Sequence, residues 1–215
     1  MESNKYLDDI TEIKNMMSRS SRFISLSGLS GILAGVYALI GAYLANLQLG
    51  QQLGSASNYG LNSRTEYTQI ASNTDLIYSL VLIAVGVILM AAITGILLTI
   101  KKSKKSGEKI WDVSSKRLLV NFLIPLLVGG IFCLVLLQYN ASGLIAPTTL
   151  LFYGLACVNA SKYTLGDIRY LGIANIIIGL LSTQFIGYGL YFWALGFGVF
   201  HIIYGALMYY KYDRQ

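Results

Sequence analysis

His201 is the only residue with an acidic or basic side chain deep inside the long apolar stretches of this chain. Gly198 and Gly205 surround it at helical spacing, so the imidazole is expected to face a neighbouring helix. A neutral imidazole offers one hydrogen-bond donor and one acceptor, and an unpaired one in hydrocarbon would be costly. We therefore expect a polar partner for His201 inside the protein.

Asn175 is the expected partner. The apolar segments 170–187 and 188–210 are joined by a short glycine-containing turn, which predicts an antiparallel helical hairpin. In such a hairpin Asn175 and His201 lie at equal depth. Small residues match in the same way: Gly172 with Gly205, Gly179 with Gly198, and Ser182 with Ala194. The register therefore predicts a hydrogen bond between the Asn175 amide and the His201 imidazole.

Two roles remain open for this pair. In the first, which we favour because the glycine neighbours indicate tight packing, the hydrogen bond only holds the two helices together. In the second, Tyr204 and Asn121 lie at related depths and widen the pair into a polar pocket, since ionisable residues within membranes often line substrate paths. The candidate site therefore contains Asn121, Asn175, His201 and Tyr204.

Few residues are suited to metal or catalytic chemistry. The chain has one His, and its apolar stretches hold no Asp or Glu, so we expect no metal site. Its glycines lie inside predicted helices rather than between a strand and a helix, so we expect no phosphate-binding loop and no cofactor. No catalytic residue is assigned, and an enzyme is not expected.

Six apolar stretches must position these side chains. Each approaches or exceeds the ~20 residues that a helix needs to cross a hydrocarbon core, and the composition is 55% hydrophobic and 12% charged. We expect an all-α, multi-pass membrane protein in which residues 23–210 form one six-helix transmembrane domain. The spans are expected at about 23–46, 76–100, 118–138, 144–162, 170–187 and 188–210.

The distribution of Lys and Arg predicts which way the bundle faces. With a cytoplasmic N-terminus, every Lys and Arg except Arg64 falls on the cytoplasmic side, as the positive-inside rule requires. Both termini are therefore expected in the cytoplasm, and the plasma (inner) membrane is the expected location. The net charge of +6 then describes one face of a membrane and does not indicate nucleic-acid binding.

Two cytoplasmic elements are candidates for contacts with partners. Residues 1–22 include a short amphipathic helix, whose apolar face over residues 5–17 would lie on the membrane, on the bundle or on a cytosolic or membrane protein partner. Residues 101–117 form a basic loop that either determines topology or binds anionic lipid head groups. Its candidate lipid contacts are Lys101, Lys102, Lys104, Lys105 and Lys109. Residues 211–215 form a short cytoplasmic tail.

The exterior loop, residues 47–75, is rich in Gly, Ser, Asn and Gln, which indicates a flexible cover. The second helix has two alternative starts. Ser63 begins a capping box with Glu66, whereas Asn73 and Thr74 are caps at the membrane interface. We favour the earlier start.

Small residues and one proline shape the expected helix contacts. The first apolar stretch should lie at the centre of the bundle, because small residues recur along one face: Gly28, Gly31, Gly35, Ala38, Ala42 and Ala45. Such faces could also join subunits into a homo-oligomer. Pro125 lacks the amide that would bond the Asn121 carbonyl, so a kink is expected there.

These features favour a non-catalytic function. We expect a membrane-embedded sensor or accessory subunit that responds to lipid or an apolar ligand and signals through its cytoplasmic elements. The alternative is a facilitator for a small neutral or lipid-like solute, which would need a connected cavity. A lipid-modifying enzyme is the third reading, and it would need a reactive group at interface depth that the sequence does not reveal.

Overall fold

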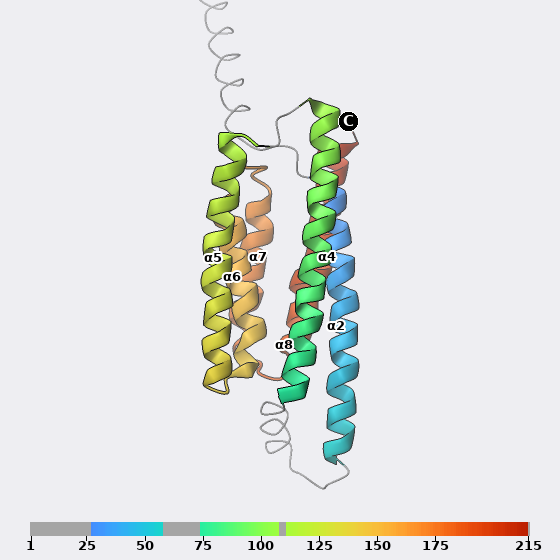
Figure 1. Cartoon of the computed structure of the whole chain (residues 1–215), viewed down its shortest axis with the longest axis vertical. Coiled ribbons are helices and arrows are strands. Elements are labelled where there is room, and N and C mark those ends of the chain that lie inside the picture. Colours follow the sequence, from blue (N-terminus) through green and yellow to red (C-terminus); the bar gives the residue numbers. More distant parts are fainter. Residues whose placement is uncertain (1–26, 58–73, 108–110, 215) are drawn as a thin grey trace, which may run out of the picture.

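The structure is a computed structural model that describes residues 27–57, 74–107 and 111–214. Over these residues every regular element is helical (Figure 1). The helices are α2 (Gly28–Ser57), α4 (Thr74–Ser106), α5 (Val113–Gln138), the 3₁₀ turn η1 (Ser142–Leu144), α6 (Ile145–Ala160) and α7 (Ile168–Ser182). A final C-terminal helix consists of α8 (Gly189–Trp193), the π-helical η2 (Ala194–Val199), α9 (Phe200–Met208) and the π-helical η3 (Tyr209–Asp213).

Within the described residues, five helices are long and apolar enough to cross a membrane, which confirms an all-helical fold compatible with a membrane bundle. They cover Gly28–Gly50, Thr74–Lys105, Val113–Gln138, Ser142–Ala160 and Gly189–Asp213. The remaining predicted span, 170–187, corresponds to α7. That helix is apolar but has only 15 residues, so it is about 22 Å long at 1.5 Å per residue.

Several helix ends differ from those expected. Residues 47–57 were expected in the exterior loop but continue α2, because Leu and Gln, both good helix formers, predominate there. The described part of α4 begins at Thr74, directly after a stretch outside the described residues, so the choice between the starts at Ser63 and at Asn73 or Thr74 stays a prediction. At its other end α4 continues to Ser106, so the first part of the expected basic loop is helical. The amphipathic segment 1–22 lies outside the described residues.

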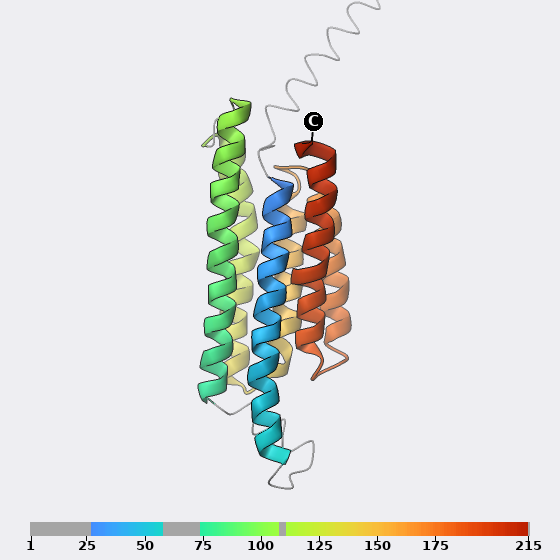
Figure 2. The ribbon, with the colours of Figure 1, turned by 90° about the vertical axis from the view of Figure 1, so that its right-hand side faces the viewer.

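The helices form two groups of three, which lie side by side in Figure 1 and one behind the other in Figure 2. In the first, here called the α2 group, α2 packs between α4 and the C-terminal helix. In the second, the α6 group, α6 packs between α5 and α7. The two groups meet mainly where α8 contacts α6 and where α8, η2 and α9 contact α7. The first apolar stretch is therefore central to one group rather than to the whole bundle.

Glycines allow the backbones within each group to touch. A Cβ on Gly35 of α2 would lie 2.6 Å from the Gly198 carbonyl oxygen, and one on Gly172 of α7 would lie 2.7 Å from that of Gly154 in α6. A Cβ on Gly205 would lie 2.4 Å from the backbone nitrogen of Ile32 in α2. Small residues have this role wherever membrane helices approach closely.

These contacts correct the expected hairpin packing. The glycines expected to match do not face each other: Gly172 and Gly179 of α7 pack on α6, whereas Gly198 and Gly205 of the C-terminal helix pack on α2. Equal depth in a hairpin determines which residues share a layer. It does not determine which neighbour each helix face turns toward.

The carbonyl exposed by Pro125 has a specific partner. The Asn159 side chain on α6 donates from Nδ2 to the Asn121 carbonyl at 2.9 Å and lies 3.3 Å from Asn121 Oδ1. Proline provides no amide for this carbonyl, so α6 supplies the missing donor. Asn121 thus belongs to the contact between α5 and α6.

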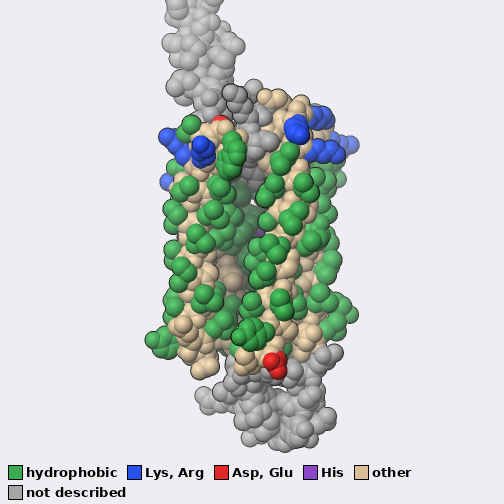
Figure 3. All heavy atoms as spheres, in the orientation of Figure 1, with side chains coloured by type: hydrophobic (Ala, Val, Ile, Leu, Met, Phe, Trp, Pro, Cys, Tyr) green, Lys and Arg blue, Asp and Glu red, His purple; other side chains and the backbone are tan. Residues whose placement is uncertain are grey.

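The outer surface is apolar between two polar ends. Leu82 and Ile88 of α4 and Leu127 and Ile131 of α5 are each more than 60% exposed. Figure 3 shows hydrophobic side chains along both helices, with Lys and Arg gathered at the end where α4 ends and α5 begins, here called the basic end. Such an apolar surface is what a lipid environment requires.

Candidate functional site

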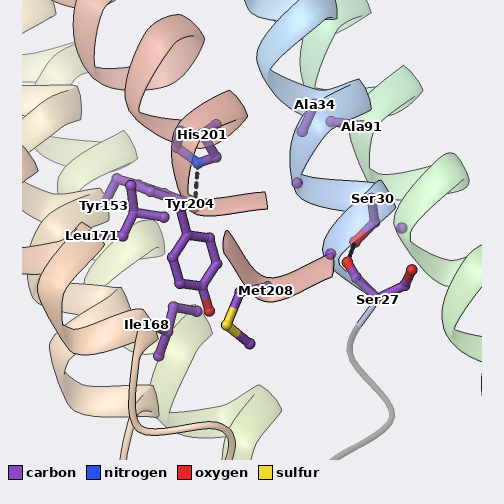
Figure 4. Close-up of a pocket in the computed structure, with 13 residues that line it drawn as sticks. Ser27, Ser30, Ala34, Ala91, Tyr153, Ile168, Leu171, His201, Tyr204 and Met208 are labelled. Carbon is purple, nitrogen blue, oxygen red and sulfur yellow. Dashed lines mark hydrogen bonds between the residues drawn. The ribbon is translucent and has the colours of Figure 1, made fainter. Parts of the chain in front are cut away.

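A cavity of about 160 Å³ lies between the two helix groups, in the half of the bundle nearer the basic end. Both groups line it (Figure 4). The lining residues are Ser27, Gly28, Ser30, Gly31 and Ala34 from α2 and its start, Ala91 and Gly95 from α4, Tyr153 from α6, Ile168 and Leu171 from α7, and His201, Tyr204 and Met208 from α9. Most of these side chains are apolar, and none is acidic or carries a fixed positive charge.

His201 is fully hydrogen-bonded at the inner end of this cavity. Its Nδ1 lies 2.9 Å from the Gly196 carbonyl oxygen, and its Nε2 lies 2.7 Å from the Tyr153 hydroxyl. A carbonyl can only accept, so we assign the proton to Nδ1 and the acceptor role to Nε2. Tyr153 therefore donates to His201, and this contact, the dashed line in Figure 4, joins α6 to α9.

The predicted hydrogen bond between Asn175 and His201 is absent. Asn175 is fully buried; its Nδ2 donates to the Leu171 carbonyl at 2.9 Å, and its Oδ1 has no hydrogen-bond partner among the described residues. The prediction was wrong because it considered only the hairpin of α7 and the C-terminal helix. His201 turns instead toward α6, a third helix.

Asn175 and His201 nevertheless meet the same residue, Gly196 in the π-helical η2. A Cβ on Gly196 would lie 2.6 Å from Asn175 Oδ1 and 2.4 Å from a methyl carbon of Leu150. On the other side its carbonyl accepts from His201. π-Helical turns often occur at functional sites because they displace side chains and carbonyls from the α-helical positions. An added methyl group would force these buried side chains to shift.

Aromatic rings hold the Tyr153 and His201 pair in place. Phe197 stacks on His201 with ring centroids 5.9 Å apart and lies 5.0 Å from Tyr153. Phe122 of α5 meets Tyr153 edge-on at 5.9 Å. Such contacts add directional stabilisation to the burial of the rings. The pair is therefore a rigid inner wall of the cavity.

Tyr204 has a different environment. Figure 4 shows its hydroxyl directed toward Ile168 and Met208, away from His201. It forms no hydrogen bond within the part of the chain that the structure describes. A buried phenol normally finds a partner, so this hydroxyl is the polar group of the cavity that remains available to another molecule.

The sequence-predicted site residues are thus divided. His201 and Tyr204 line the cavity, whereas Asn175 lies behind Gly196 and Asn121 lies between α5 and α6. Tyr153 was missed. Its position in the middle of the 144–162 stretch was a usable signal, because tyrosines in membrane proteins are otherwise enriched at the two interfaces.

Two carboxylates tie helix ends together at the basic end of the cavity, one within the α2 group and one between the two groups. Asp213 in η3 accepts from the Gly28 amide at 2.8 Å, from the Ser27 hydroxyl at 3.1 Å and from Lys102 Nζ at 2.6 Å. It therefore caps the start of α2, whose first amides lack helical partners. The same carboxylate forms an ion pair with Lys102, which lies near the end of α4.

Asp167, in the turn before α7, makes the second tie. It accepts from Lys211 Nζ at 2.7 Å and from the Tyr212 hydroxyl at 3.1 Å. The hydrogen bond from Lys211 holds the pKa of Asp167 below its ordinary value. Because Asp213, Lys211 and Tyr212 all belong to η3, this one turn links the α2 group to the α6 group.

The expected lipid-contacting lysines have unequal environments. Lys102 is paired with Asp213 and is only 24% exposed. Three others, Lys101, Lys104 and Lys105, are exposed on the last turns of α4, and Lys109 lies outside the described residues. Among the residues with described positions, no three His, Cys, Asp or Glu side chains gather at one point.

No protein-family model, curated protein or solved structure matches this chain. The class is therefore defined by the fold and the cavity alone. The described residues form an all-helical bundle, compatible with a membrane, that holds a largely apolar cavity between two helix groups.

Proposed function

We propose that this protein is a membrane-embedded sensor or accessory subunit that binds a small, neutral, largely apolar molecule between its two helix groups. In this proposal α7 completes a set of six spans, and the basic end and both termini face the cytoplasm of a plasma (inner) membrane. The distribution of Lys and Arg supports the orientation.

The observation that carries the proposal is the cavity itself. Its apolar lining suits an apolar molecule, and the Tyr204 hydroxyl offers one hydrogen bond that would orient it. A few placed polar groups in an apolar concavity are characteristic of small-molecule sites.

The position of the cavity supports sensing. A molecule held there touches α2, α4 and α9 on one side and α6 and α7 on the other. If the molecule binds more tightly to one spacing of the two helix groups than to another, its binding shifts the population of the protein toward that spacing. The contacts of Asp213 and Asp167 lie at the same end of the bundle, so a change in the spacing of the groups would change the conformation of η3 and the basic end. A partner protein could recognise that change.

Tight packing beyond the cavity argues against a facilitator. Leu150, Asn175 and Ser182 are all fully buried, and Leu150 and Asn175 close around Gly196 in the layer next to His201. A facilitator needs a continuous path, and the buried side chains of Leu150 and Asn175 occupy this layer of the described helices. Both ring nitrogens of His201 are engaged, so the cavity offers no free base for an enzymatic role either.

Native mass spectrometry of gently extracted protein tests the proposal. Gly95 lines the cavity and has free space where a side chain would go, so Gly95→Phe should fill the cavity without disturbing the helices. Gly86, also on α4 with free space, lies outside the cavity, so Gly86→Phe is the matched control. The wild type and Gly86→Phe should retain a small neutral species that Gly95→Phe loses.

Two results would overturn the proposal. One is a wild type that carries no bound molecule, and the other is equal retention by all three proteins. Solute flux through proteoliposomes that Gly95→Phe abolishes would support the facilitator instead.

A further inference from the structure

We infer that the ligand is a neutral single-chain lipid whose hydroxyl or carbonyl head occupies the cavity and whose chain leaves sideways between α4 and α5. This inference rests on the proposed function and specifies the class of molecule bound. Its four supports are the volume of the cavity, the furrow beside it, the charges near it and its hydrogen-bonding groups.

The volume suits a head group and excludes a whole lipid. A protein cavity of roughly 150 Å³ holds one benzene-sized molecule, and this one has about 160 Å³. A head of several heavy atoms therefore fits, whereas an acyl chain does not. The rest of an amphiphile has to lie outside.

A furrow between α4 and α5 provides that place. α4 packs on α2 and α5 packs on α6, and the described parts of these two outer helices do not pack closely on each other. Figure 3 shows the surface hollowed between them, with hydrophobic side chains on both walls. The cavity is lined on one side by Ala91 and Gly95 of α4 and on the other by Ile168 and Leu171 of α7. It therefore spans the gap between the two helix groups, and the furrow opens from this gap.

The charges near the cavity favour a neutral head. Lys102 stands at its basic end but is paired with Asp213 at 2.6 Å, and Asp213 in turn holds Ser27 and Gly28 of the lining. A carboxylate or phosphate head would therefore enter an apolar space next to an aspartate, without a free cation among the described lining residues. Burying an uncompensated charge in this way is strongly unfavourable.

The hydrogen-bonding groups favour a hydroxyl or a carbonyl. The Tyr204 hydroxyl has no partner among the described residues and can donate. Tyr153 already donates to His201 and also contacts the Cys157 thiol, so its hydroxyl is engaged. A hydroxyl head or a carbonyl head can accept from Tyr204.

Photolabelling with two matched probes tests this inference. The full-length protein is placed in phosphatidylcholine vesicles with a long-chain alcohol that carries a diazirine in its chain, or with the carboxylate of equal length and label. After irradiation the alcohol should label peptides of α4 and α5. The ionised carboxylate should label about tenfold less, since its buried charge would lack a partner.

Variants locate the head of the probe. Tyr204→Phe should lower labelling by the alcohol about fivefold, as expected for one lost hydrogen bond. Gly95→Phe should abolish it, while Tyr170→Phe, at an exposed tyrosine, and Gly86→Phe should leave it unchanged. In the wild type, unlabelled long-chain alcohol should compete and unlabelled fatty acid should not, a result that does not depend on any variant folding.

The outcomes separate this inference from the proposed function. Equal labelling by the carboxylate, or no competition by the unlabelled alcohol, would overturn the neutral lipid. If neither probe labels α4 and α5, but purified protein retains a small species that Gly95→Phe loses, the binding function stands and the lipid assignment falls. If nothing is retained and nothing labels, both fall.

Discussion

The Tyr153 hydroxyl on α6 lies 2.7 Å from Nε2 of His201 on α9, and this hydrogen bond connects the two helix groups at the inner end of the cavity. Its donor and acceptor come from helices that are far apart in the sequence and that belong to different groups. The stability of the pair and the shape of the cavity are therefore linked.

Removal of this hydrogen bond should destabilise the bundle modestly. Tyr153→Phe keeps the ring contacts with Phe197 and leaves Nε2 of His201 without a donor. We expect a loss of about 1 kcal/mol in the free energy of unfolding, measured by denaturant titration in detergent. Tyr170→Phe, at a 72% exposed position, is the control and should change little.

A double-mutant cycle distinguishes the two proposed partners of His201. Tyr153→Phe combined with His201→Phe should show a coupling energy of roughly 0.5–1.5 kcal/mol. Asn175→Ala combined with His201→Phe should show less, because the two side chains share no hydrogen bond. A larger coupling for Asn175 than for Tyr153 would restore the contact predicted from the hairpin.

Gly196→Ala should destabilise the packing at η2. The new methyl group would lie within 2.7 Å of the side-chain ends of Leu150, Asn175 and Ile178, which are themselves buried and would have to shift. Overpacking of this kind costs about 1–3 kcal/mol, which thermal unfolding in detergent would detect. Gly130→Ala on α5 has open space around the added carbon and should be neutral or slightly stabilising. Similar effects at both glycines would contradict the close packing at η2.

Asp213→Asn should loosen the start of α2. The change weakens the bonds from the Gly28 amide and the Ser27 hydroxyl and removes the ion pair with Lys102. Loss of a helix cap typically costs about 1 kcal/mol. Hydrogen exchange should therefore speed up at the first amides of α2. Asp75→Asn, at the exposed start of α4, is the matched control, and equal exchange in both variants would rule out the capping role.

Acid should weaken the tie between η3 and the turn before α7. The hydrogen bond from Lys211 lowers the pKa of Asp167, so its stabilisation is fully present above the ordinary aspartate pKa of about 3.9 and is lost as pH falls through the lower folded value. Below pH 4, exchange in residues 161–170 should rise in the wild type. Asp167→Asn should already exchange rapidly at neutral pH and show little further change with acid.

The presence of the long helices could be predicted from the sequence, because it depends on the local composition of each segment. Long apolar stretches predicted helices that the structure contains, and the missing amide of Pro125 predicted an unpaired carbonyl at Asn121, which Asn159 now bonds. Helix ends were less certain. At the end of α2 and at the end of α4, residues with good helix propensity carried the helix into segments that their polarity assigned to loops.

The division of the helices into two groups could not be read from the sequence. Gly172 and Gly205 each indicate a close helix contact, and both make one, but with α6 and α2 rather than with each other. A glycine marks a face where a backbone can approach and carries no information about which backbone arrives. The choice depends on how all the helices pack simultaneously.

The sequence by itself determined that this chain forms long apolar helices and that His201 needs a polar partner within them, because burial and hydrogen-bonding requirements belong to individual residues. The tertiary structure alone decided that the partner is Tyr153, that Asn175 packs behind Gly196, and that a cavity lies between the helix groups. Those outcomes depend on the rotation of each helix about its own axis and on its choice of neighbours, which only the packing of the whole bundle decides.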